Sequence, residues 1–260
     1  MTTVLITGAA GAIGRVLTAG LPPYGHQLRL LDREPIEEQD SMVGDITDPV
    51  ALDTAMSGVL AVVHLAAIPT EADFADILHE NIDGTYQVFA AARRAGVPRL
   101  VFASSNHAVG FTPRRPLVAA DAPPRPDTYY GVSKVFGEAL GRLYVDRYGM
   151  QVACLRIGSF LEQPTAVREL STWLSHPDAV QLVHACLTAP NLTYELVWGV
   201  SANTRGWWDL EPGRRLGYRP EDDAEAFALD IIAEHGEPDL GAPETAFVGG
   251  EFTRPEYDRP

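Results

Sequence analysis

Lysine is nearly absent from this chain of 260 residues. Of its 20 basic side chains all but Lys134 are arginine, and 35 acidic residues bring the formal net charge to −15. A protein that binds nucleic acid without regard to sequence needs a basic surface to displace counterions. The charge balance therefore excludes that class of protein, and it makes anionic membranes equally poor partners.

Cysteine and long apolar runs are scarce as well. Cys154 and Cys186 lie in apolar stretches without metal-ligand spacing, which predicts buried thiols in a reducing compartment and no metal site; a disulfide between them is the alternative. No apolar run approaches the roughly 18 residues of a membrane span. The first residues, MTTVLITG, lack the basic start and cleavage site of a signal peptide. We therefore expect a cytoplasmic protein without a membrane anchor.

The pattern of apolar residues in the first part of the chain fits an α/β domain. Short apolar runs alternate with longer helical patterns, and the runs read straight through, as in strands that helices cover on both faces. This alternation predicts a doubly wound parallel sheet, the Rossmann fold. The expected strands are residues 4–7, 28–31, 61–67, 99–105 and 151–158, and the expected crossover helices are residues 12–20, 72–95 and 128–148.

The pattern loosens after Gly158. Apparent helices near residues 166–188, a strand at 194–200 and an amphipathic helix at 220–235 follow. We expect residues 1–158 to form a dinucleotide-binding core that includes the helix at 128–148. Residues 159–260 are then a small substrate-binding portion that does not fold independently.

A glycine-rich turn joins the first expected strand to the first expected helix. The segment TGAAGAIG places glycines at positions 8, 11 and 14. Gly8 allows a tight turn, Gly11 lets the backbone approach a pyrophosphate, and Gly14 permits close packing of the helix on the strand. Ordinary turn chemistry is the alternative for an isolated glycine triplet. The position between a strand and a helix predicts a dinucleotide site.

An acidic residue ends the second expected strand. Asp32 can accept hydrogen bonds from the ribose 2′-hydroxyl and repels a 2′-phosphate, which favours NAD over NADP, whereas the adjacent Arg33 could accommodate that phosphate. Asp45 ends the expected third strand and is suitably placed for the adenine amino group. Alternatively Asp45 caps the helix that begins near Pro49, a role that Asp48 could equally fill.

Tyr130 and Lys134 stand four residues apart in an expected helix, so their side chains project from one face. A tyrosine with a pKa of about 10 is a poor base near neutral pH. An ammonium about 5 Å away contributes about 3 kcal/mol, or about two pKa units, at an effective dielectric constant of about 20. Tyr130 is therefore a candidate general base; a partly buried tyrosine beside a solvated lysine is the alternative.

Polar residues end the strand expected at residues 99–105. Ser104, Ser105, Asn106 and His107 lie at its carboxyl end, where ligands bind in open α/β sheets. A serine hydroxyl there can hydrogen-bond a reacting sugar oxygen. A simple turn from strand to loop is the alternative.

In this order the motifs resemble those of the extended short-chain dehydrogenase/reductases: TGAAGAIG, Asp32, HLAA at residues 64–67, Asn81, the serine and the Tyr-x-x-x-Lys pair. The spacing to Gly110 selects Ser105 as the family's catalytic serine, beside Tyr130 and Lys134. The resemblance also implies cofactor contacts at Ala12, Ile13, Ile46, Leu65, Ala66, Ala67 and Ser159.

Five segments are similar to those of one group within this family, the uronate dehydrogenases. They are FASSNHAVGF, YYGVSKVFGE, LRIGS, RELSTWLSH and VWGVSANTRGWWD. The first two are shared with sugar-nucleotide epimerases, and the last two are far more specific. The resemblance implies oxidation of D-glucuronate or D-galacturonate at C1 to an aldarolactone, with Tyr130 as general base and NAD accepting the hydride. The implied substrate contacts are Ser105, Asn106, His107, Tyr130, Ser159 and Arg168.

Arg168 is the residue that the resemblance assigns to the uronate carboxylate. A planar guanidinium suits this task because it binds both carboxylate oxygens at once. An ion pair with Glu169 or Glu162 is the alternative. Pro69 stands where the family pattern has a serine, so one contact to the sugar is missing from the pattern.

Two other functions share parts of this pattern. An NAD-dependent epimerase or dehydratase of a nucleotide-linked sugar uses the same three catalytic residues, but the 102 residues after Gly158 look short for holding a nucleotide diphosphate. A non-catalytic dinucleotide sensor commonly lacks one or more of these three catalytic residues, whereas Ser105, Tyr130 and Lys134 are all present here. The resemblance further implies a homo-oligomer, with the helices at 72–95 and 128–148 as candidate contacts.

Overall fold

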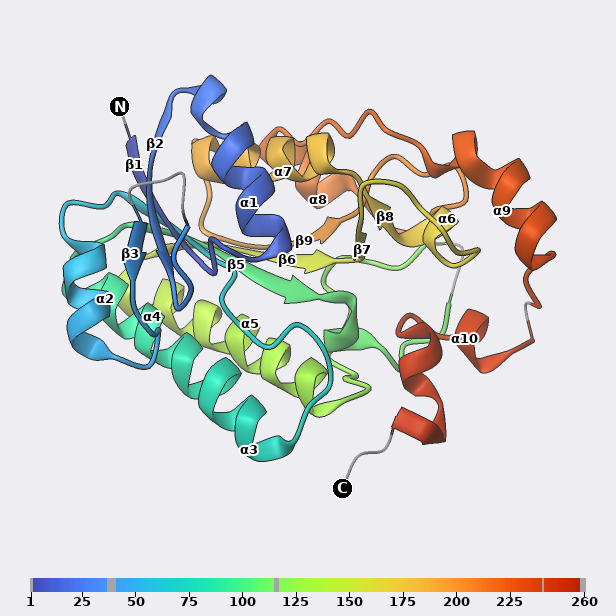
Figure 1. The fold of residues 1–260 in the computed structure, drawn as a ribbon, viewed down its shortest axis with the longest axis horizontal. Coiled ribbons are helices and arrows are strands. Elements are labelled where there is room, and N and C mark those ends of the chain that lie inside the picture. Colours follow the sequence, from blue (N-terminus) through green and yellow to red (C-terminus); the bar gives the residue numbers. More distant parts are fainter. Residues whose placement is uncertain (1, 37–40, 115–116, 240, 258–260) are drawn as a thin grey trace.

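The computed structural model describes residues 2–36, 41–114, 117–239 and 241–257, and a seven-stranded sheet lies at its centre (Figure 1). All six pairs of neighbouring strands in this sheet are parallel. The expectation of a doubly wound parallel sheet is therefore confirmed. From edge to edge the strands are β3 (Ser41–Val43), β2 (His26–Asp32), β1 (Thr2–Thr7), β4 (Ala61–His64), β5 (Arg99–Ser105), β6 (Gln151–Ile157) and β9 (Tyr194–Gly199).

Helices cover both faces of the sheet (Figure 1). Successive residues of a strand point to opposite faces. In β1, Val4 and Ile6 accordingly join one hydrophobic core and Leu5 joins another, which explains the unbroken apolar run. The first core is covered by α1 (Ala12–Gly20) and α7 (His176–Thr188), and the second by α2 (Pro49–Met56), α4 (Gly84–Arg94) and α5 (Tyr129–Tyr148).

The segment expected as one helix over residues 72–95 is divided into three elements. A short α3 (Phe74–Asp76) leads into η2 (Ile77–Asp83), a π-helical stretch of seven residues, and α4 completes the segment. Such stretches are rare and frequently lie at functional sites. Two 3₁₀ turns lie elsewhere in this half of the chain, η1 (Pro22–Tyr24) and η3 (Asn106–Val109).

The chain after Gly158 contributes both to the main sheet and to a region beyond the carboxyl ends of its strands (Figure 1). Strand β9 extends the sheet beside β6, and α7 packs on α1. The helices expected near 166–188 are present, whereas the helix expected at 220–235 begins only at Ala224, with a 3₁₀ turn before its α-helical part. The remaining elements are β7 (Ser159–Phe160), α6 (Glu169–Thr172), β8 (Trp173–Leu174), α8 (Glu211–Leu216), η4 (Ala224–Phe227), α9 (Ala228–His235), α10 (Pro243–Ala246), η5 (Gly250–Thr253) and η6 (Pro255–Tyr257).

The strand order reverses its direction between β1 and β4. In open α/β sheets ligands bind outside the carboxyl ends of the strands at such a reversal. Gly8 directly follows β1 and Leu65 directly follows β4. The topology therefore places the glycine-rich turn at the expected binding crevice.

Cys154 in β6 and Cys186 in α7 are buried and unpaired, as expected, and burial raises the pKa of the Cys186 thiol to about 12. No helix within the described ranges has both the length and the apolar character that a membrane crossing needs. Those ranges also contain no group of three His, Cys, Asp or Glu side chains that could hold a metal ion.

Candidate active site

The glycine-rich turn leaves no room for side chains. Gly8 has a φ of +73°, and a Cβ atom there would lie 2.6 Å from the Ala66 backbone nitrogen. A Cβ atom on Gly14 would lie 2.4 Å from the Gly8 carbonyl oxygen. Gly11 begins α1 without a side-chain cap, so the first backbone N–H groups of the helix remain available to an anion.

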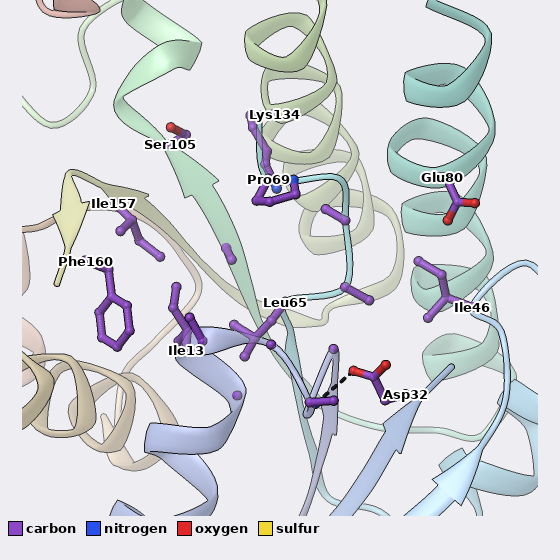
Figure 2. A pocket seen from close by; sticks show the side chains of 18 of the residues that line it. Ile13, Asp32, Ile46, Leu65, Pro69, Glu80, Ser105, Lys134, Ile157 and Phe160 are labelled. Atoms are coloured by element: carbon purple, nitrogen blue, oxygen red, sulfur yellow. Dashed lines mark hydrogen bonds between the residues drawn. The ribbon is translucent and has the colours of Figure 1, made fainter. Parts of the chain in front are cut away.

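Asp32 is held by the backbone around it. Its Oδ2 accepts a hydrogen bond from the Ala10 nitrogen at 2.8 Å, and its Oδ1 accepts one from the Glu34 nitrogen at 3.0 Å (Figure 2). Each carboxylate oxygen keeps a second lone pair for a ligand hydroxyl. The carboxylate is therefore oriented before any ligand binds.

The sequence left open whether Asp45 or Asp48 caps the helix that begins near Pro49. Asp48 caps α2, because its Oδ1 accepts a hydrogen bond from the Val50 nitrogen at 2.9 Å. Asp45 instead lines the cavity that is described below, and it accepts hydrogen bonds from the nitrogen and the hydroxyl of Thr47. Burial opposes ionisation of Asp45, but these bonds and the charge of Arg33 lower its pKa overall.

A cavity of about 600 Å³ extends from the glycine-rich turn to the end of β5. Eighteen of the residues singled out in the sequence line it. They are Gly8, Gly11, Ala12, Ile13, Gly14, Asp32, Arg33, Asp45, Ile46, Leu65, Ala66, Ala67, Ser104, Ser105, Asn106, His107, Tyr130 and Lys134. Pro69 also lines this cavity (Figure 2). The parallel sheet thus brings together residues that are up to 126 positions apart in the sequence.

Lys134 is buried beside Tyr130 in α5. The Lys134 Nζ atom lies 5.2 Å from the centroid of the Tyr130 ring and 5.3 Å from that of Phe102. Within the described part of the chain this ammonium has no hydrogen bond and no ion pair, and burial lowers the pKa of Lys134 to about 8. A buried cation without a counter-charge is costly unless a ligand supplies the partner.

Tyr130 differs from the expectation drawn from its spacing to Lys134. Burial raises the pKa of Tyr130 to about 12, although a side-chain hydrogen bond with Ser105 acts in the opposite direction. The expected lowering by about two units therefore does not occur in the ligand-free protein. The physical reason is burial, which penalises the charged phenolate, and the nearby charge of Asp127 raises the pKa of Tyr130 further.

Two polar residues outside α5, Glu71 and Asn81, hold this helix in place. The Glu71 carboxylate accepts hydrogen bonds from the Tyr129 and Tyr130 backbone nitrogens at 3.2 and 2.8 Å. Asn81 of η2 donates to the Ser133 hydroxyl at 3.1 Å and exchanges two hydrogen bonds with the backbone of Ile68. Asn81 belongs to the family motif, whereas no pattern in the sequence points to Glu71.

The far end of the cavity is built around His107. Its Nδ1 lies 2.7 Å from Oδ2 of Asp127, whose side chain is fully buried. The His107 ring also packs against Phe252, with ring centroids 4.3 Å apart. Neither Asp127 nor Phe252 was singled out in the sequence, because each meets His107 only through the fold.

Ser159 and Arg168 do not line the cavity that the other candidates share. The Ser159 hydroxyl is hydrogen-bonded to that of Thr172 at 2.8 Å. Arg168 donates from Nη2 to the Val248 carbonyl oxygen at 2.8 Å, and the same oxygen accepts from Asn106 Nδ2 at 3.1 Å. Arg168 is thus joined to the cavity wall through Val248. Burial lowers the pKa of Arg168 to about 10, although nearby carboxylates act in the opposite direction.

The parallel sheet, the glycine cradle at the strand reversal and the Tyr130–Lys134 pair define a dinucleotide-dependent enzyme of the Rossmann class. A family model described as "NAD dependent epimerase/dehydratase family" matches residues 4–161. The chain belongs to that family.

Individual relatives resemble this chain over nearly their whole length. A uronate dehydrogenase of Agrobacterium fabrum is 43% identical over 97% of both chains, and one of Pseudomonas putida is 41% identical over 96% of this chain and 94% of its own. The crystal structure of uronate dehydrogenase from Agrobacterium tumefaciens superimposes with a TM-score of 0.91 at 43% identity, covering 97% of each chain. A mutant of that enzyme has been crystallised in complex with NAD.

Proposed function

We propose that this protein oxidises a free hexuronate, D-glucuronate or D-galacturonate, at C1 to the aldarolactone, with NAD as the electron acceptor. The observation that carries the proposal is the single cavity in which the glycine cradle, Ser105 and the Tyr130–Lys134 pair meet. The uronate dehydrogenases among the relatives support the substrate class.

The residues of the cavity fit the dinucleotide. The close contacts at Gly8 and Gly14 leave the backbone bare for a pyrophosphate, and the oriented Asp32 carboxylate suits a ribose hydroxyl. The unpartnered ammonium of Lys134 suits the second ribose. When bound, NAD supplies the acceptor for the C1 hydride and the positive charge of its nicotinamide.

Tyr130 takes the proton of the anomeric hydroxyl in this account, while Ser105 holds the same oxygen as it becomes a carbonyl. Because burial raises the pKa of Tyr130 to about 12 in the free protein, the phenolate needs cationic support at the moment of proton transfer. Lys134, whose Nζ atom lies 5.2 Å from the centroid of the Tyr130 ring, provides that support and orients the neighbouring ribose. Burial makes each of these interactions stronger than in water.

The remaining polar residues orient the sugar. Asn106 and His107 face the cavity beside Ser105, and Asp127 fixes the ring of His107. We propose that Ser159 lies beside the nicotinamide and the substrate. We propose that Arg168 binds the carboxylate of the uronate. The Arg168 guanidinium donates to the Val248 carbonyl oxygen, which also accepts from Asn106 of the cavity wall, so the two side chains share one acceptor beside the cavity.

We further propose a cytoplasmic homo-oligomer. The buried free thiols of Cys154 and Cys186 suit a reducing compartment. In this proposal the oligomer forms through α3, η2, α4 and α5, where apolar side chains are exposed. Size-exclusion chromatography with light scattering tests the subunit count. These side chains are Phe74, Leu78, Tyr86, Tyr129, Val132, Leu143 and Tyr148.

The experiment that tests the function follows NADH formation with NAD and, in turn, free glucuronate, free galacturonate, glucose and UDP-glucose. We expect NADH with at least one free uronate and little with glucose. Turnover of UDP-glucose without net NADH would instead favour an epimerase or dehydratase of a nucleotide-linked sugar, the activity that the family description also covers. NADH from neither uronate would overturn the proposal.

A further inference from the structure

The end of the cavity beside Asp32 carries an unusual balance of charge. Asp32, Glu34, Asp45 and Glu80 line this end together with Arg33, which is its sole cation among the lining residues that the structure describes. Figure 2 shows Asp32, Ile46 and Glu80 here and Ser105 and Phe160 at the opposite end. The end beside Asp32 therefore holds four carboxylates and one guanidinium.

Arg33 is engaged by two of these carboxylates. Its Nη1 atom donates to Oε1 of Glu80 at 2.9 Å and lies 3.9 Å from Oδ2 of Asp45. The Arg33 side chain is 59% exposed and Glu80 only 20% exposed. Glu80 is thus the more buried partner and makes the shorter contact, whereas the Arg33 side chain is largely exposed to solvent.

The π-helical stretch η2 fixes Glu80. The next residue, Asn81, is hydrogen-bonded to Ile68 and to Ser133 of α5, so this part of the backbone is anchored on both sides. Of two successive residues of η2, Glu80 lines the cavity and bonds Arg33, whereas Asn81 is buried beneath it and bonds Ser133 of α5. Glu80 is therefore held by a packed element rather than a loop.

We infer that Glu80 is a positioning residue that selects NAD over NADP by holding Arg33. The inference rests on the proposed use of NAD. A 2′-phosphate carries a charge of about −2 near neutral pH, and with Glu80 in place it meets four carboxylates and an arginine whose charge is already paired. Without Glu80, Arg33 is released, and its planar N–H groups are the natural partners of a phosphate.

The test measures binding of NAD and of NADP by titration calorimetry, without turnover. The proteins are the parent, Glu80→Gln, Arg33→Ala and the double variant. Asp53→Asn is the matched control, because it removes one carboxylate charge from an ion pair with Arg94 outside the cavity. The control separates a local effect from the change in net charge.

We expect Glu80→Gln to shift the ratio of the two affinities about tenfold toward NADP, and Asp53→Asn to leave the ratio as in the parent. In the Arg33→Ala background the Glu80→Gln shift should disappear. An unchanged ratio in Glu80→Gln overturns the inference, and so does a shift that persists without Arg33, since simple repulsion would then explain it. Uronate-dependent NADH formation tests the proposed function separately, so each can fail alone.

Discussion

Lys134 is the residue whose environment most clearly demands a ligand. Its side chain is buried beside the Phe102 and Tyr130 rings and lines the cavity, and its ammonium has no counter-charge among the described residues. Burial lowers its pKa to about 8, so the folded protein releases this proton more readily than the unfolded chain does. Function at this position is therefore achieved at the expense of stability.

Replacing Lys134 by methionine removes the charge and keeps a chain of similar length. We expect the ligand-free variant to be more stable than the parent at pH 7, with turnover reduced at least about 100-fold. Between pH 8 and 10.5 the unfolded parent binds more protons than the folded one, so the parent gains stability as pH rises and the difference shrinks. Urea unfolding from pH 7 to 10 measures this; a variant less stable than the parent at pH 7 would contradict it.

The buried ring of His64 makes the stability of the protein depend on pH. Its ring is buried between the Thr7 and Thr85 hydroxyls at 2.8 and 3.1 Å, and burial, with the charge of Lys134, lowers the pKa of His64 to about 3. Between pH 6.5 and 3 the unfolded chain binds more protons, so the free energy of unfolding falls as pH falls. A His64→Gln variant should lose up to about 1.4 kcal/mol per pH unit of this slope. Denaturant titrations at several pH values check it, and equal slopes in the two proteins would refute it.

Among the elements, the segment around η5 links the C-terminal region to the cavity. The Val248 carbonyl oxygen accepts hydrogen bonds from both Asn106 and Arg168, and Phe252 packs on His107. A Cβ atom on Gly250 would lie 2.7 Å from Nε of Arg168, so the backbone passes directly over the guanidinium. This segment therefore holds the side chain of Arg168, which we propose as the residue that binds the substrate carboxylate.

An Arg168→Ala variant tests that arrangement. We expect the KM for a uronate to rise about tenfold or more, because a charged hydrogen-bonding partner is lost, and the KM for a neutral aldose to rise much less. Arg168→Lys should recover part of the loss, since it restores the charge without the planar pair of donors. If both substrates are affected equally, Arg168 acts by holding Val248 and does not bind the carboxylate.

The elements also show which parts of the site the sequence can predict. The glycine turn, Asp32 and the Tyr130–Lys134 pair are local patterns tied to a strand or a helix, and the parallel sheet brings them to one edge. The roles of Glu71, Asp127 and Val248 arise from contacts between distant segments, as in the hydrogen bond that joins Asn106 to a residue 142 positions away. No periodicity encodes such contacts.

At the level of the whole molecule, the chain after Gly158 completes the sheet and the core that the first part begins. Strand β9 covers the edge of β6, and α7 contributes Leu182, Val183 and Cys186 to the core beside α1. Each such side chain contributes about 1.5–3 kcal/mol when fully buried. A chain that ends at Gly158 exposes this core and leaves the sheet edge unpaired.

We therefore propose that neither residues 1–158 nor residues 159–260 fold alone. The expected outcome is the absence of a cooperative thermal transition in either fragment, with a sharp transition in the full chain. Calorimetry of the three proteins gives the answer. A cooperative transition in the fragment 1–158 would show that the dinucleotide-binding core is independent of the rest.

In the proposed reaction Tyr130, supported by Lys134, removes a proton from a free uronate. The most direct measurement is the initial rate of NADH formation with glucuronate or galacturonate in the parent and in Tyr130→Phe, together with the NAD dissociation constant of each. We predict turnover in the parent, a loss of at least about 1,000-fold in the variant, and similar NAD affinity in both. Comparable turnover in the variant would contradict the role of Tyr130, and absence of turnover in the parent would contradict the activity itself.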